Sequence, residues 1–507
     1  MQIKVESGDI TQQPTRAIII NLLEGLSQPV GAAAAVDRSL DGAISRLIAD
    51  GDLRGKYNDL TLVHTTGKIP ASQVLVIGLG KQEELTLDRV RDVAANAARY
   101  LRRQRCRSAA TVTHGEGVAG LEAEACAQAI AEGTLMGLYT FRRHKKRDED
   151  ETDLEELTLV EEDASKLEAL RRGVELGIVL AEAANFCRDL ANEPSNVLTP
   201  SEMAERARAM AHEAGLECQI LERKDMEDLG MGALLGVAQG SQQPPKLIVL
   251  HYRGAPGEEG ALGLVGKGIT FDAGGISIKP SAGMEAMKGD MSGGAAIIAA
   301  MRAIGQLRPA INVTAIVPAT ENMPSGSALK PGDVLRAMNG KTIEIINTDA
   351  EGRLILADAL SYARRLGLSP IVDVATLTGA ISVALGNVAL GAMTNDEAVL
   401  EKVKRAATAA GEKVWQLPMY EEYKEQIKSD VADMKNTGGR AAGSITAAFL
   451  LKEFVEDTPW VHLDMAGVDN YDKEKGVMVK GASGIPVRTL VQLALALAEE
   501  RGQPASK

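Results

Sequence analysis

From about residue 180 to the C-terminus, short apolar runs alternate with longer stretches in which apolar positions recur every three or four residues. Short runs bounded by turn residues predict buried strands, and the longer periodic stretches predict helices. The predicted strands are Lys246–Tyr252, Ala261–Val265, Ile311–Val317, Thr342–Ile346, Ile371–Ala375 and Val461–Asp464. The predicted helices are Gly293–Ile304, Ile355–Leu366, Ala398–Ala409 and Ile445–Phe454. This order predicts an α/β fold with a mostly parallel central sheet flanked by helices.

The preceding part of the chain shows a similar alternation. Its predicted strands are Ala17–Leu23, Leu60–Val63, Val74–Leu79, Ala109–Thr113 and Glu156–Val160. Leu87–Arg103 predicts a helix, because its apolar residues form one stripe at helical spacing. Ala164–Leu190 has helical periodicity. We therefore predict an N-terminal α/β domain over residues 1–163, a connecting helix over 164–191 and a second domain over 192–507. The pattern of the N-terminal domain resembles that of macrodomain-like folds.

Composition narrows the class of protein. A chain of 507 residues with 45% hydrophobic residues is long enough for two or three units with cores of their own. It has no apolar run long enough to span a membrane, and Met1–Glu6 lacks the apolar segment of a secretory signal. The four cysteines lie far apart, which is typical of reduced thiols, so we expect a cytoplasmic protein without a membrane partner. The net charge of −13 argues against chain-wide affinity for nucleic acid.

The most informative polar segment is Asn347–Leu354, which reads Asn-Thr-Asp-Ala-Glu-Gly-Arg-Leu after an apolar run. If the run is a strand that continues through this segment, Asp349 and Glu351 point to the same side, because side chains alternate along a strand. Two carboxylates so placed can bind divalent cations, and Arg353 can hold an anion beside them.

A second polar segment, Val265–Pro280, follows the predicted strand Ala261–Val265 and is rich in glycine. It contains Lys267, Asp272 and Lys279, and Asp290 follows a few residues later. Charged residues on a loop after a parallel strand are typical of an α/β active site. The alternative is a solvated turn with surface charges, which would explain any one of these residues but not the whole set.

Both segments resemble the signature of the leucine aminopeptidase family, the cytosolic two-metal exopeptidases. The unbroken Asn347–Leu354 motif and the spacing of the upstream lysines and aspartates carry this resemblance, which extends from about Asn185 to the C-terminus. It implies a catalytic metallopeptidase domain over residues 192–507. It implies a tight metal, Zn²⁺ or Mn²⁺, bound by Lys267, Asp272, Asp290 and Glu351. It also implies a second, looser metal, Mn²⁺, Mg²⁺ or Zn²⁺, bound by Asp272, Asp349 and Glu351.

The same resemblance implies an activity and further roles. The expected reaction is hydrolysis of the N-terminal peptide bond of a peptide by a water activated between two metals. Lys279 resembles the lysine that donates to the oxyanion, and Arg353 resembles the arginine that holds a bicarbonate ion as proton acceptor. Pocket residues for an apolar N-terminal side chain, leucine or methionine, are implied at Met287, Thr376, Leu377 and Gly379. The family also implies a homohexamer.

A role in DNA binding is the alternative from a different class, additional to catalysis. Five arginines lie at the end of the predicted helix Leu87–Arg103, and a second basic run spans Arg142–Arg147. Basic patches of this kind can contact phosphates. However, arginines are common at helix C-termini, and four acidic residues follow the second run directly. The five arginines are Arg99, Arg102, Arg103, Arg105 and Arg107.

Overall fold

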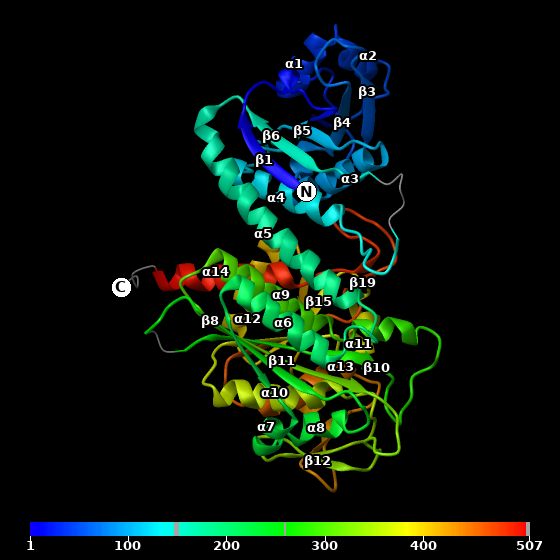
Figure 1. The fold of residues 1–507 in the computed structure, drawn as a ribbon, viewed down its shortest axis with the longest axis vertical. Helices are drawn as coiled ribbons and strands as arrows, with labels where there is room; N and C mark the ends of the chain where they lie inside the picture. The colour runs from blue at the N-terminus through cyan, green and yellow to red at the C-terminus, as the bar shows by residue number, and fades with distance from the viewer. Residues whose placement is uncertain (147–151, 258–259, 503–507) are drawn as a thin grey trace. The chain divides into compact units, whose positions relative to one another are not determined.

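The computed structural model describes residues 1–146, 152–257 and 260–502, and the chain divides into two compact α/β units (Figure 1). The N-terminal unit comprises Met1–Glu182 and the later segment Asp472–Lys480. The C-terminal unit comprises Ala183–Tyr471 and Gly481–Lys507. The division falls inside the long helix α5, Leu167–Asn192, which covers most of the segment predicted as a connecting helix. The predicted α/β class is confirmed.

A six-stranded sheet with the order β1-β6-β5-β2-β4-β3 forms the centre of the N-terminal unit. All of its neighbours are parallel except β3 and β4. Its strands are β1 Gln2–Ser7, β2 Ala17–Leu23, β3 Leu60–His64, β4 Gln73–Gly80, β5 Ser108–Thr111 and β6 Glu156–Glu161. The accompanying helices are α1 Gly31–Ser39, α2 Ala43–Ala49, α3 Leu87–Arg103 and α4 Ala123–Gly137. Thr86 starts α3 by accepting a hydrogen bond from the Arg89 amide, and the predicted apolar stripe is buried.

The C-terminal unit is built on a nine-stranded sheet with the order β16-β15-β18-β14-β9-β11-β8-β7, in which β10 also pairs with β11. Five of its neighbouring pairs are parallel and three antiparallel, which confirms a mostly parallel sheet. The strands are β7 Glu217–Leu221, β8 Lys246–Arg253, β9 Leu262–Gly266, β10 Gly268–Asp272, β11 Asn312–Asn322, β14 Ile371–Ala375, β15 Leu390–Thr394, β16 Val414–Gln416 and β18 Trp460–Asp464.

Helices flank this sheet, and small sheets lie beside it (Figure 1). The helices are α6 Pro200–Ala214, α7 Arg223–Asp228, α8 Gly232–Ala238, α9 Ser292–Leu307, α10 Gly352–Arg365, α11 Gly379–Leu385, α12 Glu397–Ala410, α13 Gly443–Val455 and α14 Val487–Gly502. The small sheets contain β12 Val334–Arg336, β13 Thr342–Glu344 and β17 Met434–Lys435, and separately β19 Asn470–Tyr471 and β20 Gly481–Ala482. Among the described residues, none of the helices combines the length and apolar character needed to cross a bilayer.

Two local predictions are wrong. The run predicted as a strand at Thr342–Ile346 forms β13 only as far as Glu344, and β13 pairs with β12 and β17 rather than joining the large sheet. The next seven residues are loop, so strand alternation does not align Asp349 with Glu351. Conversely, part of the predicted glycine-rich loop is the strand β10, because Gly268–Asp272 pairs in parallel with the end of β11.

Candidate metal centre

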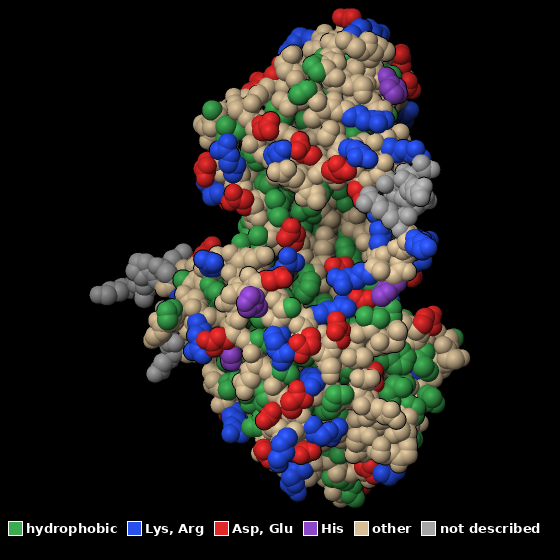
Figure 2. All heavy atoms as spheres, viewed as in Figure 1, with side chains coloured by type: hydrophobic (Ala, Val, Ile, Leu, Met, Phe, Trp, Pro, Cys, Tyr) green, Lys and Arg blue, Asp and Glu red, His purple; other side chains and the backbone are tan. Residues whose placement is uncertain are grey.

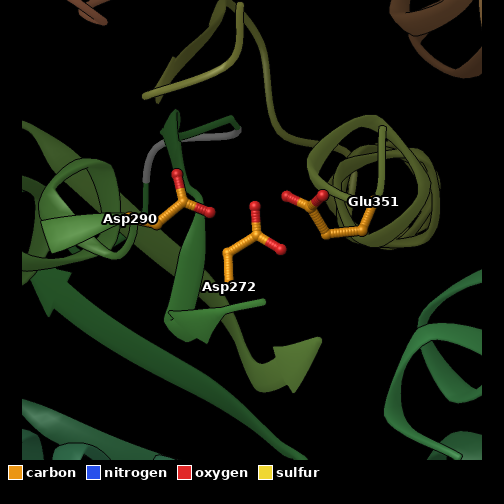
Figure 3. A group of neighbouring side chains, drawn as sticks. All are labelled: Asp272, Asp290 and Glu351. Atoms are coloured by element: carbon orange, nitrogen blue, oxygen red, sulfur yellow. The ribbon is translucent and has the colours of Figure 1, made fainter. Parts of the chain in front are cut away.

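Four separate elements bring the predicted charged residues together at one end of the large sheet. Lys267 follows β9 and Asp272 ends β10. Asp290 follows a short 3₁₀ helix, Met284–Gly289, and Glu351 immediately precedes α10. Oxygen atoms of Asp272, Asp290 and Glu351 lie within 4.8 Å of one another, and all three side chains are buried. Figure 3 shows these three carboxylates, the carboxylate cluster, pointing toward a common centre.

Small residues allow the helices to approach the strands this closely. A Cβ atom on Gly293, in the first turn of α9, would lie 2.2 Å from the Val374 carbonyl oxygen on β14. A Cβ atom on Gly352, the first residue of α10, would lie 2.7 Å from Cε of Lys267. At Gly293 the contact is with backbone, so a side chain would force α9 away from β14, and at Gly352 a side chain would displace the end of Lys267 from its present position.

Lys267 lies within the carboxylate cluster and its side chain is only 3% exposed. Its Nζ is 2.8 Å from Asp290 Oδ2 and 2.8 Å from Glu351 Oε1, and it donates to the Thr376 carbonyl oxygen at 2.9 Å. Burial alone would lower the pKa of this amine, but the neighbouring carboxylates overcome that effect and raise it. Lysine ligates a metal only as the neutral amine, so Lys267 must release this proton when a cation binds there.

Lys279 and Asp349 form the more accessible side of the site. Lys279 Nζ is 2.8 Å from Asp272 Oδ2 and 2.6 Å from Asp349 Oδ1, and the two side chains are 22% and 32% exposed. Burial raises the pKa of Asp349, and the hydrogen bond from Lys279 opposes that shift. The structure therefore brings all five predicted metal ligands and Lys279 into one network of contacts.

Two further residues, Asn322 and Thr376, orient the carboxylates directly. The buried Asn322 amide donates from Nδ2 to Asp272 Oδ1 at 2.8 Å and to the Thr348 carbonyl oxygen at 3.0 Å. The Thr376 hydroxyl donates to Asp290 Oδ1 at 2.7 Å. The sequence predicts no role for Asn322, because no motif near the end of β11 indicates that this side chain binds a carboxylate. Thr376 was predicted as a pocket residue, and its hydroxyl contacts Asp290.

Arg353 lies in the first turn of α10 and is 7% exposed. Its Nη1 donates to the Asn436 carbonyl oxygen at 2.9 Å, whereas its Nε has no hydrogen-bond partner among the described residues. Burial lowers the pKa of its guanidinium to about 10, although Glu351 and Asp464 oppose that shift. A buried guanidinium with donor capacity to spare is suited to an anion.

The remaining predicted pocket residues lie close in the chain to Asp290 and Thr376. Met287 is half-buried in the 3₁₀ helix before Asp290, Leu377 packs against the core of the unit, and Gly379 is exposed at the start of α11. A concave region of about 980 Å³ elsewhere on the surface is lined by residues of β15, the segment after β16 and the end of α13. It includes none of the predicted site residues, so the chemistry of the side chains locates the site better than surface shape does.

The donor set fits divalent cations. Three buried carboxylates in mutual contact repel one another unless positive charge lies between them, and here the lysine ammonium groups supply that charge. Carboxylate oxygens suit Mg²⁺ or Mn²⁺, and a lysine nitrogen moves one position toward Zn²⁺.

Comparisons with known proteins find matches to one family. Residues 185–491 match the catalytic domain of the cytosol aminopeptidase family, and residues 20–148 match the N-terminal domain of the same family. A probable cytosol aminopeptidase of Alkaliphilus metalliredigens is 48% identical over 97% of this chain and 99% of its own length. A probable cytosol aminopeptidase of Solibacter usitatus is 49% identical over 98% of this chain and 99% of its own length.

Solved structures show the same likeness. A mutant of tomato leucine aminopeptidase superimposes with a TM-score of 0.87 at 35% identity, covering 98% of this chain and 96% of that one. The bottromycin maturation enzyme BotP in complex with Mn superimposes with a TM-score of 0.83 at 35% identity, covering 96% of this chain and 100% of that one.

Proposed function

The chain belongs to the cytosol aminopeptidase family, and from that premise we propose that it hydrolyses N-terminal peptide bonds at a two-metal centre formed by the carboxylate cluster. Aminopeptidase activity, a hydrolase activity of the exopeptidase class, follows from the family. The observation that carries the two-metal proposal is the convergence of three buried carboxylates with two lysines. Peptides are the substrates.

We assign the ligands in two overlapping sets. Lys267, Asp272, Asp290 and Glu351 would hold a tight cation, Zn²⁺ or Mn²⁺, and Asp272, Asp349 and Glu351 a looser one, Mn²⁺, Mg²⁺ or Zn²⁺. The greater exposure of Asp349 supports placing the exchangeable ion on its side. Bound there, the two cations would lower the pKa of a water nucleophile and polarise the scissile carbonyl group.

Side chains of the protein would supply the other functions that the reaction needs. Lys279 Nζ would donate to the oxyanion formed at the scissile carbon, and its contacts with Asp272 and Asp349 support this role. Arg353 would hold a bicarbonate ion, which supplies a proton acceptor, and its buried guanidinium supports that role. Asn322 and Thr376 fix the orientations of Asp272 and Asp290, so little reorganisation is needed during the reaction.

Substrate preference, assembly and location are proposed on the same premise. Met287, Thr376, Leu377 and Gly379 would surround the side chain of the N-terminal residue, favouring leucine or methionine. The family suggests a homohexamer. The relatives' names as cytosol aminopeptidases suggest a cytoplasmic location.

The test compares leucine p-nitroanilide with its N-acetylated form, before and after chelation. We expect hydrolysis of the first substrate only, because an aminopeptidase acts on the bond that follows a free N-terminal amine. We also expect loss on chelation and recovery with Mn²⁺ or Zn²⁺. Equal hydrolysis of the acetylated substrate, or activity that survives chelation, would contradict the proposal.

The DNA-binding alternative stays a prediction. Arg99 is buried and donates to the carbonyl oxygens of Gly137 and Gly476, and Arg102 is half-buried and donates to that of Leu138. Only Arg103, Arg105 and Arg107 of that group are exposed. On the face shown in Figure 2, basic and acidic side chains of the N-terminal unit are interspersed. Arg147, at the end of the second basic run, lies outside the described residues.

A further inference from the structure

Asn436 occupies a position beside the metal centre that the proposed function does not use. It follows β17, which runs parallel to β13, and its backbone amide donates to the Glu344 carbonyl oxygen at 2.8 Å. Its side chain is fully buried. It therefore lies beside the point where the chain leaves β13 and turns toward Asp349.

The side-chain amide of Asn436 binds that turn through four hydrogen bonds. Oδ1 accepts from the amides of Ile346 at 2.8 Å and Asn347 at 3.3 Å. Nδ2 donates to the carbonyl oxygens of Asn347 at 2.6 Å and Ala350 at 3.4 Å. These bonds use both donors and both lone pairs of the amide, so the surroundings fix which end is oxygen and which is nitrogen. The bonded residues, Ile346, Asn347 and Ala350, lie on both sides of Thr348 and Asp349.

Asn436 also contacts the catalytic side of the site through its backbone. Its carbonyl oxygen accepts the hydrogen bond from Arg353 Nη1 at 2.9 Å. In contrast, no hydrogen bond in the described part of the chain joins Asn436 to Asp272, Asp290 or Glu351. The side-chain hydrogen bonds of Asn436 therefore go to the Asp349 turn, and its backbone bonds go to Glu344 and Arg353.

The Asp349 turn has a second attachment that does not involve Asn436. The Thr348 hydroxyl donates to the Gly274 carbonyl oxygen at 2.6 Å and accepts from the Ser277 amide at 2.8 Å. Loss of the Asn436 side chain would leave the turn held by these bonds of Thr348, by the Asn322 amide and by the contact of Lys279 with Asp349. We expect Asp349 to remain in place on average but with a less defined orientation.

We propose that Asn436 is a positioning residue that holds Asp349 against the carboxylate cluster and thereby sets the affinity of the looser metal position. This inference rests on the proposed two-metal function. The tight position needs Lys267, Asp272, Asp290 and Glu351, none of which Asn436 holds. Removal of the Asn436 amide should therefore weaken one metal position and spare the other. Partners that orient a metal ligand typically change affinity by about 10- to 100-fold.

The experiment measures Mn²⁺ binding to the full-length chain and its Asn436→Ala and Asn436→Ser variants, by calorimetry and by counting bound metal. The serine variant retains one hydroxyl and guards against a folding failure of the alanine variant. Asn395→Ala is the matched control, because the Asn395 side chain also makes backbone hydrogen bonds, to Glu456, Thr458 and Trp460, but none near the cluster.

We expect the Asn436 variants to keep the tight Mn²⁺ and to bind the second one about 10- to 100-fold more weakly. Their hydrolysis of leucine p-nitroanilide should recover as Mn²⁺ is raised. Asn395→Ala should lower only the unfolding midpoint. Asn436 variants with both wild-type Mn²⁺ affinities would overturn the inference and leave the proposed function standing. A wild-type chain that binds no second ion would overturn both.

Discussion

Replacement of Asn322 by leucine tests how much the site depends on one buried amide. Asn322 is 4% exposed, and its Nδ2 donates to Asp272 Oδ1 and to the Thr348 carbonyl oxygen. Leucine has a similar volume but no donor, so these two acceptors, and Glu351 Oε2 with its longer bond of 3.4 Å, lose a buried partner. A hydrogen bond to a charged group contributes about 1.5–3 kcal/mol and a neutral one about 0.5–1.5 kcal/mol. We expect Asn322→Leu to lower the free energy of unfolding by about 2–4 kcal/mol.

The assay is urea unfolding of chelated protein, followed by Mn²⁺ titration of the folded protein. Because Asp272 belongs to both proposed ligand sets, Mn²⁺ affinity should fall by about 10- to 100-fold at both positions. Asn339→Leu is the control, since the hydrogen bonds of the half-buried Asn339 amide within the described residues go to backbone groups of Lys341 and Glu453. A free energy of unfolding within about 0.5 kcal/mol of wild type, with unchanged Mn²⁺ affinity, would refute the reasoning.

Three other changes have distinct signatures. Gly352→Ala should reduce activity and stability, because the alanine Cβ would lie 2.7 Å from Lys267 Cε. Helix propensity alone favours alanine by about 1 kcal/mol, so a variant that is more stable and fully active would contradict this expectation. Lys279→Met should lower kcat by about 10²- to 10³-fold with little change in KM, and a change in KM alone would exclude oxyanion stabilisation. Burial raises the pKa of Asp358 from 3.8 to about 7, so its stabilising contribution is complete below pH 3.8 and is lost as pH rises through 7. Asp358→Asn should remove that part of the pH dependence of unfolding, by up to about 1.4 kcal/mol per pH unit, and an unchanged pH profile would count against it.

Regular elements and the charged residues of the site were predictable from local patterns. The apolar stripe of Leu87–Arg103 reproduced α3, and Ala17–Leu23 reproduced β2, because each pattern is complete within the segment itself. The lysines and acids of both motifs converge as expected. These residues lie close enough together in the sequence to form two recognisable motifs.

The parts that failed depend on partners far away in the chain. Asp349 and Glu351 were predicted on a strand, but the small sheet ends at Glu344, and Asn436 then binds the following turn from 90 residues away. Asn322 is 50 residues from Asp272. An isolated asparagine carries no periodicity or motif, so its role becomes visible only when the fold places it against unpaired backbone groups or a carboxylate.

The most direct test of the account is to follow activity while metal is returned to the chelated protein one equivalent at a time. If both proposed positions are needed, hydrolysis of leucine p-nitroanilide should remain low through the first equivalent of Mn²⁺ and rise with the second. Asp349→Asn should bind the first equivalent normally and stay nearly inactive. Full activity at one equivalent, or activity in Asp349→Asn equal to that of the wild type, would contradict the two-metal centre.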